Sequence, residues 1–326
     1  MNAQNPDYSW LPHRHHQVLF TLAQADDHIW RCLDALYDYV TGDTMELETV
    51  PREGRAHLTV KSVASLPEAV ARYAADALTQ MRAALEHTLF AEVEYQLQRS
   101  LTSKEERCIE MPVYDESGKF TKWLKDKRRA TVSPLHEGSE LSARIAELQP
   151  YNHSDYEHHP LRLLAEYTNQ AKHRAPAVAS TRLGVIIPDY AHPELEIHGF
   201  GEDQVLRSGT VLVSGPYTLN VGLSIWPQVS IMRPHTQSWH LLIRELQSIE
   251  LWVRTVALPH LIVGRQDVDA LPPHLDITRG YSDFEDALRH AEPTSAGERA
   301  DSRIRAEAWG REMRELQQIM GSTTTK

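Results

Sequence analysis

The segment Ser65–Gln98, SLPEAVARYAADALTQMRAALEHTLFAEVEYQLQ, decides the fold. Ser65 can cap a helix, Pro67 suits its first turn, and Glu68 completes a capping box with Ser65. Apolar side chains then recur on one helical face for about nine turns. These side chains are Val70, Tyr73, Ala77, Met81, Leu85, Leu89, Val93 and Leu97. The segment therefore predicts one long helix, from Pro67 to Gln98, that forms the spine of the protein.

Further helical and strand-like patterns flank this spine. The other predicted helices span about 12–40, 139–148, 160–174 and 236–256. Two strand-like runs at 45–50 and 56–63 are joined by a turn-like sequence at 51–54, and short alternating runs between 183 and 231 predict a small antiparallel sheet. The expected fold class is α+β, with a helix-rich core around one long central helix and small antiparallel strands.

The chain is expected to divide into one domain and a tail. Residues 1–263 should form a single α+β domain, because helical and strand patterns succeed one another there without a linker. Its expected parts are a helical core at 12–175, a strand-rich part at 180–235 and a closing helix at 236–258. Residues 264–326 are Pro-rich and charged, and they predict an extended tail that carries one helix near 300–320.

Composition limits the function classes. The hydrophobic share of 41% and the charged share of 24% are typical of a globular protein. Cys32 and Cys108 lack metal-type spacing and are too few for a disulfide framework, which favours a reducing compartment. No signal peptide is recognisable, and no apolar run approaches the roughly 20 residues that cross a bilayer. We therefore expect a cytoplasmic protein without a membrane partner.

Residues 100–135 are polar and predict a long surface excursion, with a short strand at 108–114. The net charge of -11 repels polyanions at long range, so nucleic acid would need a local basic patch. One such patch lies in this excursion. It consists of Lys122, Lys125, Lys127, Arg128 and Arg129, with Asp126 as the only acid among them. We take Lys125, Lys127 and Arg128 as candidate contacts for a phosphate backbone.

Two short motifs carry the candidate chemistry. The first is Arg82-Ala-Ala-Leu-Glu-His87 in the central helix, and the second is Asn169-Gln-Ala-Lys-His-Arg174 at the end of a later helix. A histidine can exchange protons near neutral pH, and an arginine can hold a phosphate by two hydrogen bonds. Together they would suit metal-independent cleavage of RNA. Glu86, Asn169, Lys172, His173 and Arg174 are the further candidate substrate contacts.

Each motif also has an ordinary structural explanation. Arg82 and Glu86 lie four residues apart, so they can form a helix-surface ion pair. His87 lies roughly 140 degrees around the helix axis from Arg82, so the two share a site only if the helix is distorted or a second chain contributes. Lys172, His173 and Arg174 can stabilise the negative end of a helix dipole.

These motifs resemble those of a widespread group of uncharacterised bacterial proteins. In that group an LRSALDH helix is followed by QPY and then by a helix that ends in N-x-DKHR. The matching stretches here are Met81–His87, Leu148-Gln-Pro-Tyr151, and the helix that begins at Pro160 and ends at Asn169–Arg174. The likeness extends over roughly residues 65–260 and implies the order of elements rather than an activity.

The arginine-to-histidine spacing also resembles the signature of HEPN ribonucleases, which are helical bundles found in toxin and antiphage systems. The resemblance implies that Arg82 and His87 form a catalytic pair, usually assembled across a homodimer, that acts on RNA without a cofactor. The strands between the predicted helices depart from a plain helical bundle.

Two other classes remain open at this stage. The same residues could be structural in a non-catalytic sensor or protein-interaction module. Alternatively, a histidine-rich loop could hold a divalent metal ion, because imidazole and carboxylate groups are closely spaced there. Its candidate ligands are His153, Asp155, His158 and His159. No GxSxG elbow, phosphate-binding GxxxxGK[ST] loop or dinucleotide GxGxxG motif occurs, which disfavours serine hydrolases, P-loop enzymes and Rossmann oxidoreductases.

Overall fold

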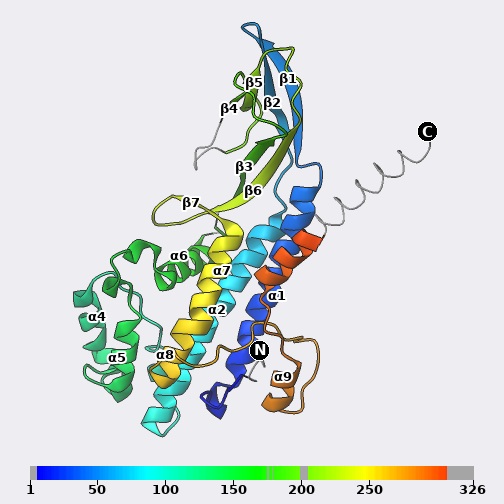
Figure 1. Ribbon diagram of the computed structural model, residues 1–326. Coiled ribbons are helices and arrows are strands. Elements are labelled where there is room, and N and C mark those ends of the chain that lie inside the picture. Colours follow the sequence, from blue (N-terminus) through cyan, green and yellow to red (C-terminus); the bar gives the residue numbers. More distant parts are fainter. Residues whose placement is uncertain (1–5, 175, 178, 199–204, 307–326) are drawn as a thin grey trace.

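The computed structural model describes residues 6–174, 176–177, 179–198 and 205–306. Within these residues, long helices form a body from which two small antiparallel sheets project (Figure 1). The fold is α+β, as the sequence predicts. No helix in this part of the chain is both long enough and apolar enough to cross a bilayer.

Helix α2 (Glu68–Leu97) is the spine of the body. Most of its predicted apolar face is buried, and Ala74, Leu78 and Ala84 widen that face. Helix α2 can therefore pack against partners on two sides. The predicted capping box is wrong, because the N-cap is Pro67 and no side chain caps it. Pro67 has an extended ψ of 129°, so the helix begins at Glu68 and leaves Ser65 too far away to cap it.

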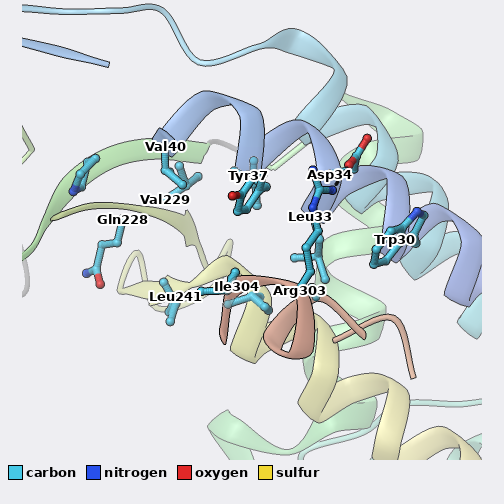
Figure 2. A pocket seen from close by; sticks show the side chains of 14 residues that line it. Trp30, Leu33, Asp34, Tyr37, Val40, Gln228, Val229, Leu241, Arg303 and Ile304 are labelled. Carbon is cyan, nitrogen blue, oxygen red and sulfur yellow. Dashed lines mark hydrogen bonds and ion pairs between the residues drawn. The ribbon is translucent and has the colours of Figure 1, made fainter. Parts of the chain in front are cut away.

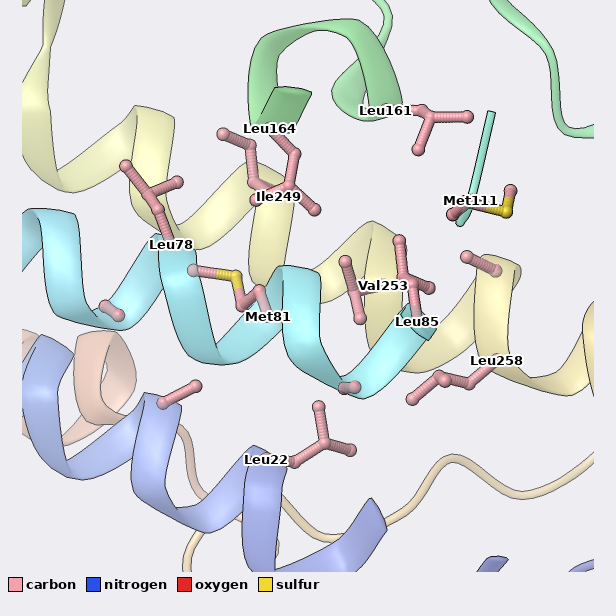
Figure 3. Close-up of a cluster of buried hydrophobic side chains, with 14 of the residues drawn as sticks. Leu22, Leu78, Met81, Leu85, Met111, Leu161, Leu164, Ile249, Val253 and Leu258 are labelled. Atoms are coloured by element: carbon pink, nitrogen blue, oxygen red, sulfur yellow. The ribbon is translucent and has the colours of Figure 1, made fainter. Parts of the chain in front are cut away.

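Three helices pack around this spine. Helix α1 (Gln17–Thr41) runs along one side of α2, whereas α6 (Pro160–His173) and α7 (Leu242–Trp252) cover the other (Figure 1). Figure 3 shows the shared core, in which Leu22 of α1, Met81 of α2 and Leu164 of α6 are all buried. Each such side chain contributes about 1.5–3 kcal/mol by leaving water. The core therefore fixes α2 at the centre of the body.

The closing helix differs from its prediction at both ends. Residues 239–241 form strand β7 (Trp239–Leu241), and the helical path then continues through α7, a π-helical turn (Val253–Ala257) and α8 (Leu258–Val263). Gln237, at a φ of 58°, reverses the chain so that β7 pairs with β6 instead of starting a helix. The π-helical turn precedes Pro259, which cannot donate a regular helical hydrogen bond.

The predicted single sheet is two sheets. Strands β1 (Met45–Arg52), β2 (Arg55–Val63), β5 (Val211–Gly215) and β4 (Glu196–Ile197) form one. Strands β3 (Ala179–Pro188), β6 (Leu223–Met232) and β7 form the other. We call the first sheet, together with the adjoining ends of β3 and β6, the arm (Figure 1). The arm has its own small core around Val60, Ile186 and Leu212.

Residues 100–135 are not the surface excursion that their polarity predicts. They form α3 (Ser103–Glu106), α4 (Ser117–Leu124) and two short 3-10 turns, and α5 (Glu140–Glu147) follows. Met111, Phe120, Trp123, Val132 and Leu135 are buried in the main core. These apolar residues are few and lie far apart in the sequence, so they show no helical or strand-like spacing. They nevertheless anchor this polar segment to the core.

The segment after residue 263 is folded against the body rather than extended. It contains α9 (Phe284–His290), which the sequence prediction missed, and residues 296–306 are helical as well. Ala296 and Ala300 are buried in the main core. We call residues 296–306 the terminal segment. The remainder of the predicted helix near 300–320 lies outside the described residues.

Candidate functional site

In the Arg82–His87 motif, Arg82 and Glu86 bind the backbone of Met111. Arg82 donates from Nε to Oε1 of Glu86 at 2.7 Å, and its Nη2 donates to the carbonyl of Met111. Oε2 of Glu86 accepts the amide of Met111 at 2.7 Å. The expected Arg82–Glu86 ion pair is therefore present, and the same pair binds both polar backbone groups of one residue.

The Leu148-Gln-Pro-Tyr151 stretch contributes to the same backbone segment. Gln149 is fully buried, and its Nε2 donates to the carbonyl of Pro112 at 2.9 Å. Its Oε1 accepts the amide of Tyr114 at 3.0 Å. Arg82, Glu86 and Gln149 thus satisfy four backbone groups in residues 111–114, a stretch without a strand partner among the described residues. We call this arrangement the clamp. The strand predicted at 108–114 is absent from the described structure, because these backbone groups bond to side chains instead of to a neighbouring strand.

His87 does not join Arg82. His87 is exposed on another part of the α2 surface, whereas the Arg82 guanidinium is engaged in the clamp. The spacing of five residues already separates their directions around the helix. Within one chain, the structure does not bring the candidate catalytic pair together on a common cleft.

The residues that end α6 have no comparable structural role. Asn169, Lys172, His173 and Arg174 are all exposed. In the described part of the chain, none of them forms an ion pair. Their position in the last turn suits the helix dipole. The structure does not connect them to Arg82 or His87 by any hydrogen bond among the described residues.

The basic patch is largely neutralised. Lys125 pairs with Glu137 at 3.1 Å, and Arg128 pairs with Asp126 at 2.9 Å. Hydrogen bonds from Arg128 lower the pKa of Asp126 to about 2. Arg129 is buried under Trp123 and donates to main-chain carbonyls. Lys122 and Lys127 are exposed and form no ion pair among the described residues, so the patch keeps only part of the free positive charge that its sequence indicates.

The histidine-rich loop is arranged in pairs. His158 contacts the Asp155 carboxylate at 2.5 Å, and the rings of His153 and His159 lie 4.4 Å apart. Burial and the neighbouring His153 lower the pKa of His159 to about 4. His159 is the N-cap of α6, where its Nδ1 accepts the amide of Leu161. Among the described residues, no three potential ligands are grouped as a metal ion would require.

An apolar cavity of about 190 Å³ lies where the body, the sheet and the terminal segment meet (Figure 2). We call it the junction cavity. Trp30, Leu33 and Tyr37 of α1 form one wall, and Val229 of β6 and Ile243 of α7 form another. Ala300, Arg303 and Ile304 of the terminal segment close a third side. Its main polar feature is the ion pair between Arg303 and Asp34, at 2.5 Å.

Sequence reasoning missed this cavity. Leu33, Leu36 and Tyr37 belong to the apolar face that predicts the first helix, and a helix face by itself does not show whether its partner fills the space. The only available signal is the width of that face, since Trp30 extends it beyond a single stripe. Val229 and Ile304 come from distant parts of the chain, so their meeting depends on the tertiary fold.

The arm exposes apolar side chains next to this cavity. Val185 of β3 is paired directly with Trp226 of β6, and Ile187 follows on the same face of β3. Trp226 is 46% exposed and Ile187 52%. Pro227, Gln228 and Val229 follow Trp226 along β6 and line the junction cavity. One strand therefore connects the cavity with an exposed apolar surface.

Comparison with known proteins does not place this site in a family. No family model matches the chain, and no curated protein or solved structure is significantly similar to it.

Proposed function

We propose that this chain is a non-catalytic sensor that binds a small apolar molecule of one or two rings in the junction cavity. The observation that carries the proposal is the position of the cavity, at the meeting point of the helical body, the β3–β6–β7 sheet and the terminal segment. A ligand there would touch all three parts at once. It could therefore change how they are held together.

The size and lining of the cavity set the ligand class. An apolar cavity of about 150 Å³ in another protein stays dry and binds benzene. The junction cavity, at about 190 Å³, has room for a slightly larger molecule. Trp30 and Tyr37 offer two aromatic surfaces. A neutral aromatic molecule would bury its rings against these walls without placing a charge in the cavity.

The lining favours binding over reaction. The ionisable residues of the wall are Asp34, Tyr37 and Arg303, and Asp34 and Arg303 neutralise each other at the rim. The Arg303 guanidinium also lies 4.3 Å from the Tyr37 ring centroid. Among the described residues of the wall there is no histidine, cysteine or serine. Strand β6 would then carry a change at Val229 to the exposed surface at Trp226.

The test is thermal unfolding of the protein with indole, a two-ring probe. At 100 times its dissociation constant, a ligand stabilises the folded state by about 2.7 kcal/mol, which is a rise of roughly 5 °C in Tm. Ala300→Leu places a larger side chain in the cavity and should abolish the rise. Ala306→Leu is the matched control, because Ala306 is exposed on the same helical segment. No rise in the wild type, or an equal rise in Ala300→Leu, would refute the proposal.

RNA cleavage by Arg82 and His87 stays a prediction, as do RNA binding and a homodimer. The clamp gives Arg82 a structural role, which favours the non-catalytic alternative over the nuclease. A nuclease would need a second chain to complete the pair, since His87 is exposed on a different part of α2.

A further inference from the structure

The terminal segment lies along one stripe of α1. Asp26, Trp30, Asp34 and Tyr37 follow one another at helical spacing on α1, and two arginines of the segment contact them. Arg299 contacts Asp26 and the ring of Trp30. Arg303 contacts Asp34 and the ring of Tyr37. The segment is therefore held in one register against the helix that forms a wall of the cavity.

The two ion pairs in this register differ sharply in burial. Asp26 is 1% exposed, whereas the side chain of Asp34 is 49% exposed. Asp26 accepts Nη2 of Arg299 at 2.6 Å and the backbone amide of Ala296 at 2.6 Å, and it contacts Nδ1 of His274 at 3.2 Å. A buried carboxylate that loses its partners strongly destabilises the folded protein, whereas an exposed ion pair contributes little to its stability.

We propose that Asp26 is a positioning residue for the junction cavity, whose third wall it holds in place by binding the first turn of the terminal segment. The residues that form this wall, Ala300, Arg303 and Ile304, follow Arg299 in the same helical segment. Breaking the Asp26–Arg299 pair would release this turn, remove the wall and expose Val229, which is buried in the intact structure. The inference rests on the proposed function for its purpose, and it concerns how a ligand enters the same site.

The terminal segment also packs against α7, on the side away from α1, and this contact supports one defined position for its first turn. Gly297 is buried, and a Cβ atom there would lie 1.7 Å from Nε2 of Gln247 on α7. The first turn is thus confined between α7 on one side and Asp26 of α1 on the other. Burial raises the pKa of Asp26 above its usual value, although Arg299 and the Ala296 amide oppose this rise. These two partners therefore favour the charged form of the carboxylate against the effect of burial.

Access to the cavity can be measured without a ligand. Val229→Cys places a thiol in the wall, where Val229 is 4% exposed, and the rate of its reaction with a small thiol reagent reports opening. Both native cysteines are buried, and burial raises the pKa of Cys32 to about 12. The native cysteines should therefore react only slowly with the reagent. The protein without Val229→Cys provides the background rate.

In this Val229→Cys protein, Asp26→Asn and Arg299→Gln should each raise the labelling rate about tenfold or more, because each breaks the buried pair. The matched control, Asp34→Asn, breaks the exposed pair and should change the rate less than about twofold. Arg299 is partly exposed, so Arg299→Gln carries the test if Asp26→Asn fails to fold. Equal rates in all three variants, or no increase from either pair variant, would overturn the inference.

The indole and labelling experiments together distinguish failure of this inference from failure of the proposed function. If the wild type shows no stabilisation by indole but labelling follows the expected order, the sensor proposal fails and the role of Asp26 stands. If indole stabilises the wild type but the labelling rates do not change, the role of Asp26 fails alone.

Discussion

The clamp and the junction cavity are opposite kinds of region. In the clamp, three polar side chains satisfy four backbone groups of one segment. In the junction cavity, apolar side chains from α1, β6 and the terminal segment meet without filling the space between them. The clamp contains Arg82, one of the two residues that look catalytic in the sequence, and the cavity contains residues that look like ordinary core. Conspicuous polar motifs can therefore be structural, while a binding site can be hidden among apolar residues.

The largest expected effect is loss of the clamp. Gln149→Ala would leave the buried carbonyl of Pro112 and the amide of Tyr114 unpaired, so we expect a loss of about 3 kcal/mol in the free energy of unfolding. Denaturant unfolding measures this loss. Arg82→Ala should be less than additive with Gln149→Ala, because both residues hold the same four-residue segment.

A matched control is available on the same helix. Arg72 and Glu68 form an ion pair at the same spacing as Arg82 and Glu86, but both side chains are exposed. Arg72→Ala should therefore cost less than about 0.5 kcal/mol. If Arg72→Ala and Arg82→Ala destabilised the protein equally, Arg82 would have no special structural role.

An intermediate effect is expected at His159, which is buried but not part of either region. Its pKa is about 4, below the ordinary 6.5, so the unfolded chain binds a proton more readily than the folded one. The stability contributed by neutral His159 is complete above pH 6.5 and is lost as the pH falls towards 4, by roughly 1–3 kcal/mol.

His159→Asn isolates this effect, because asparagine can cap α6 without titrating. The difference in unfolding free energy between the wild type and this variant, measured from pH 7 to pH 4, should move in favour of the variant at low pH. A difference that stays constant with pH would rule out His159 as the titrating group.

The smallest expected effect is at His87. Because its side chain is exposed and outside the clamp, His87→Ala should change the free energy of unfolding by less than about 0.5 kcal/mol. It should also leave any RNA cleavage by the purified protein unchanged. Cleavage of mixed RNA by the wild type that disappears in His87→Ala would instead support the nuclease and weaken the contrast between the clamp and the cavity.

Local patterns predicted the helical body well. The spacing of apolar residues located α1, α2, α5 and α6 to within a few residues, and Glu53-Gly54, both at positive φ, forms the expected turn between β1 and β2. Prediction failed where contacts between distant segments outweigh local pattern. The sequence of strand β7 predicts a helix, because the pairing of β7 with β6 cannot be seen in a single segment.

The candidate site was less predictable for the same reason. The sequence shows that Arg82 and Glu86 can pair, but not that Met111 lies beside them. Asp26 looks like an ordinary surface residue of an amphipathic helix, yet a segment some 270 positions later buries it. A cavity is the space that side chains from distant segments leave unfilled, and no local residue pattern predicts that space.

The most direct measurement is a crystal structure of the protein soaked with 5-bromoindole, in which anomalous scattering locates the bromine atom. A bromine peak between Tyr37 of α1 and Val229 of β6, lost in Ala300→Leu crystals, is the expected result. A bromine peak elsewhere, or none while the cavity remains empty, would contradict the assignment of this cavity as the ligand site.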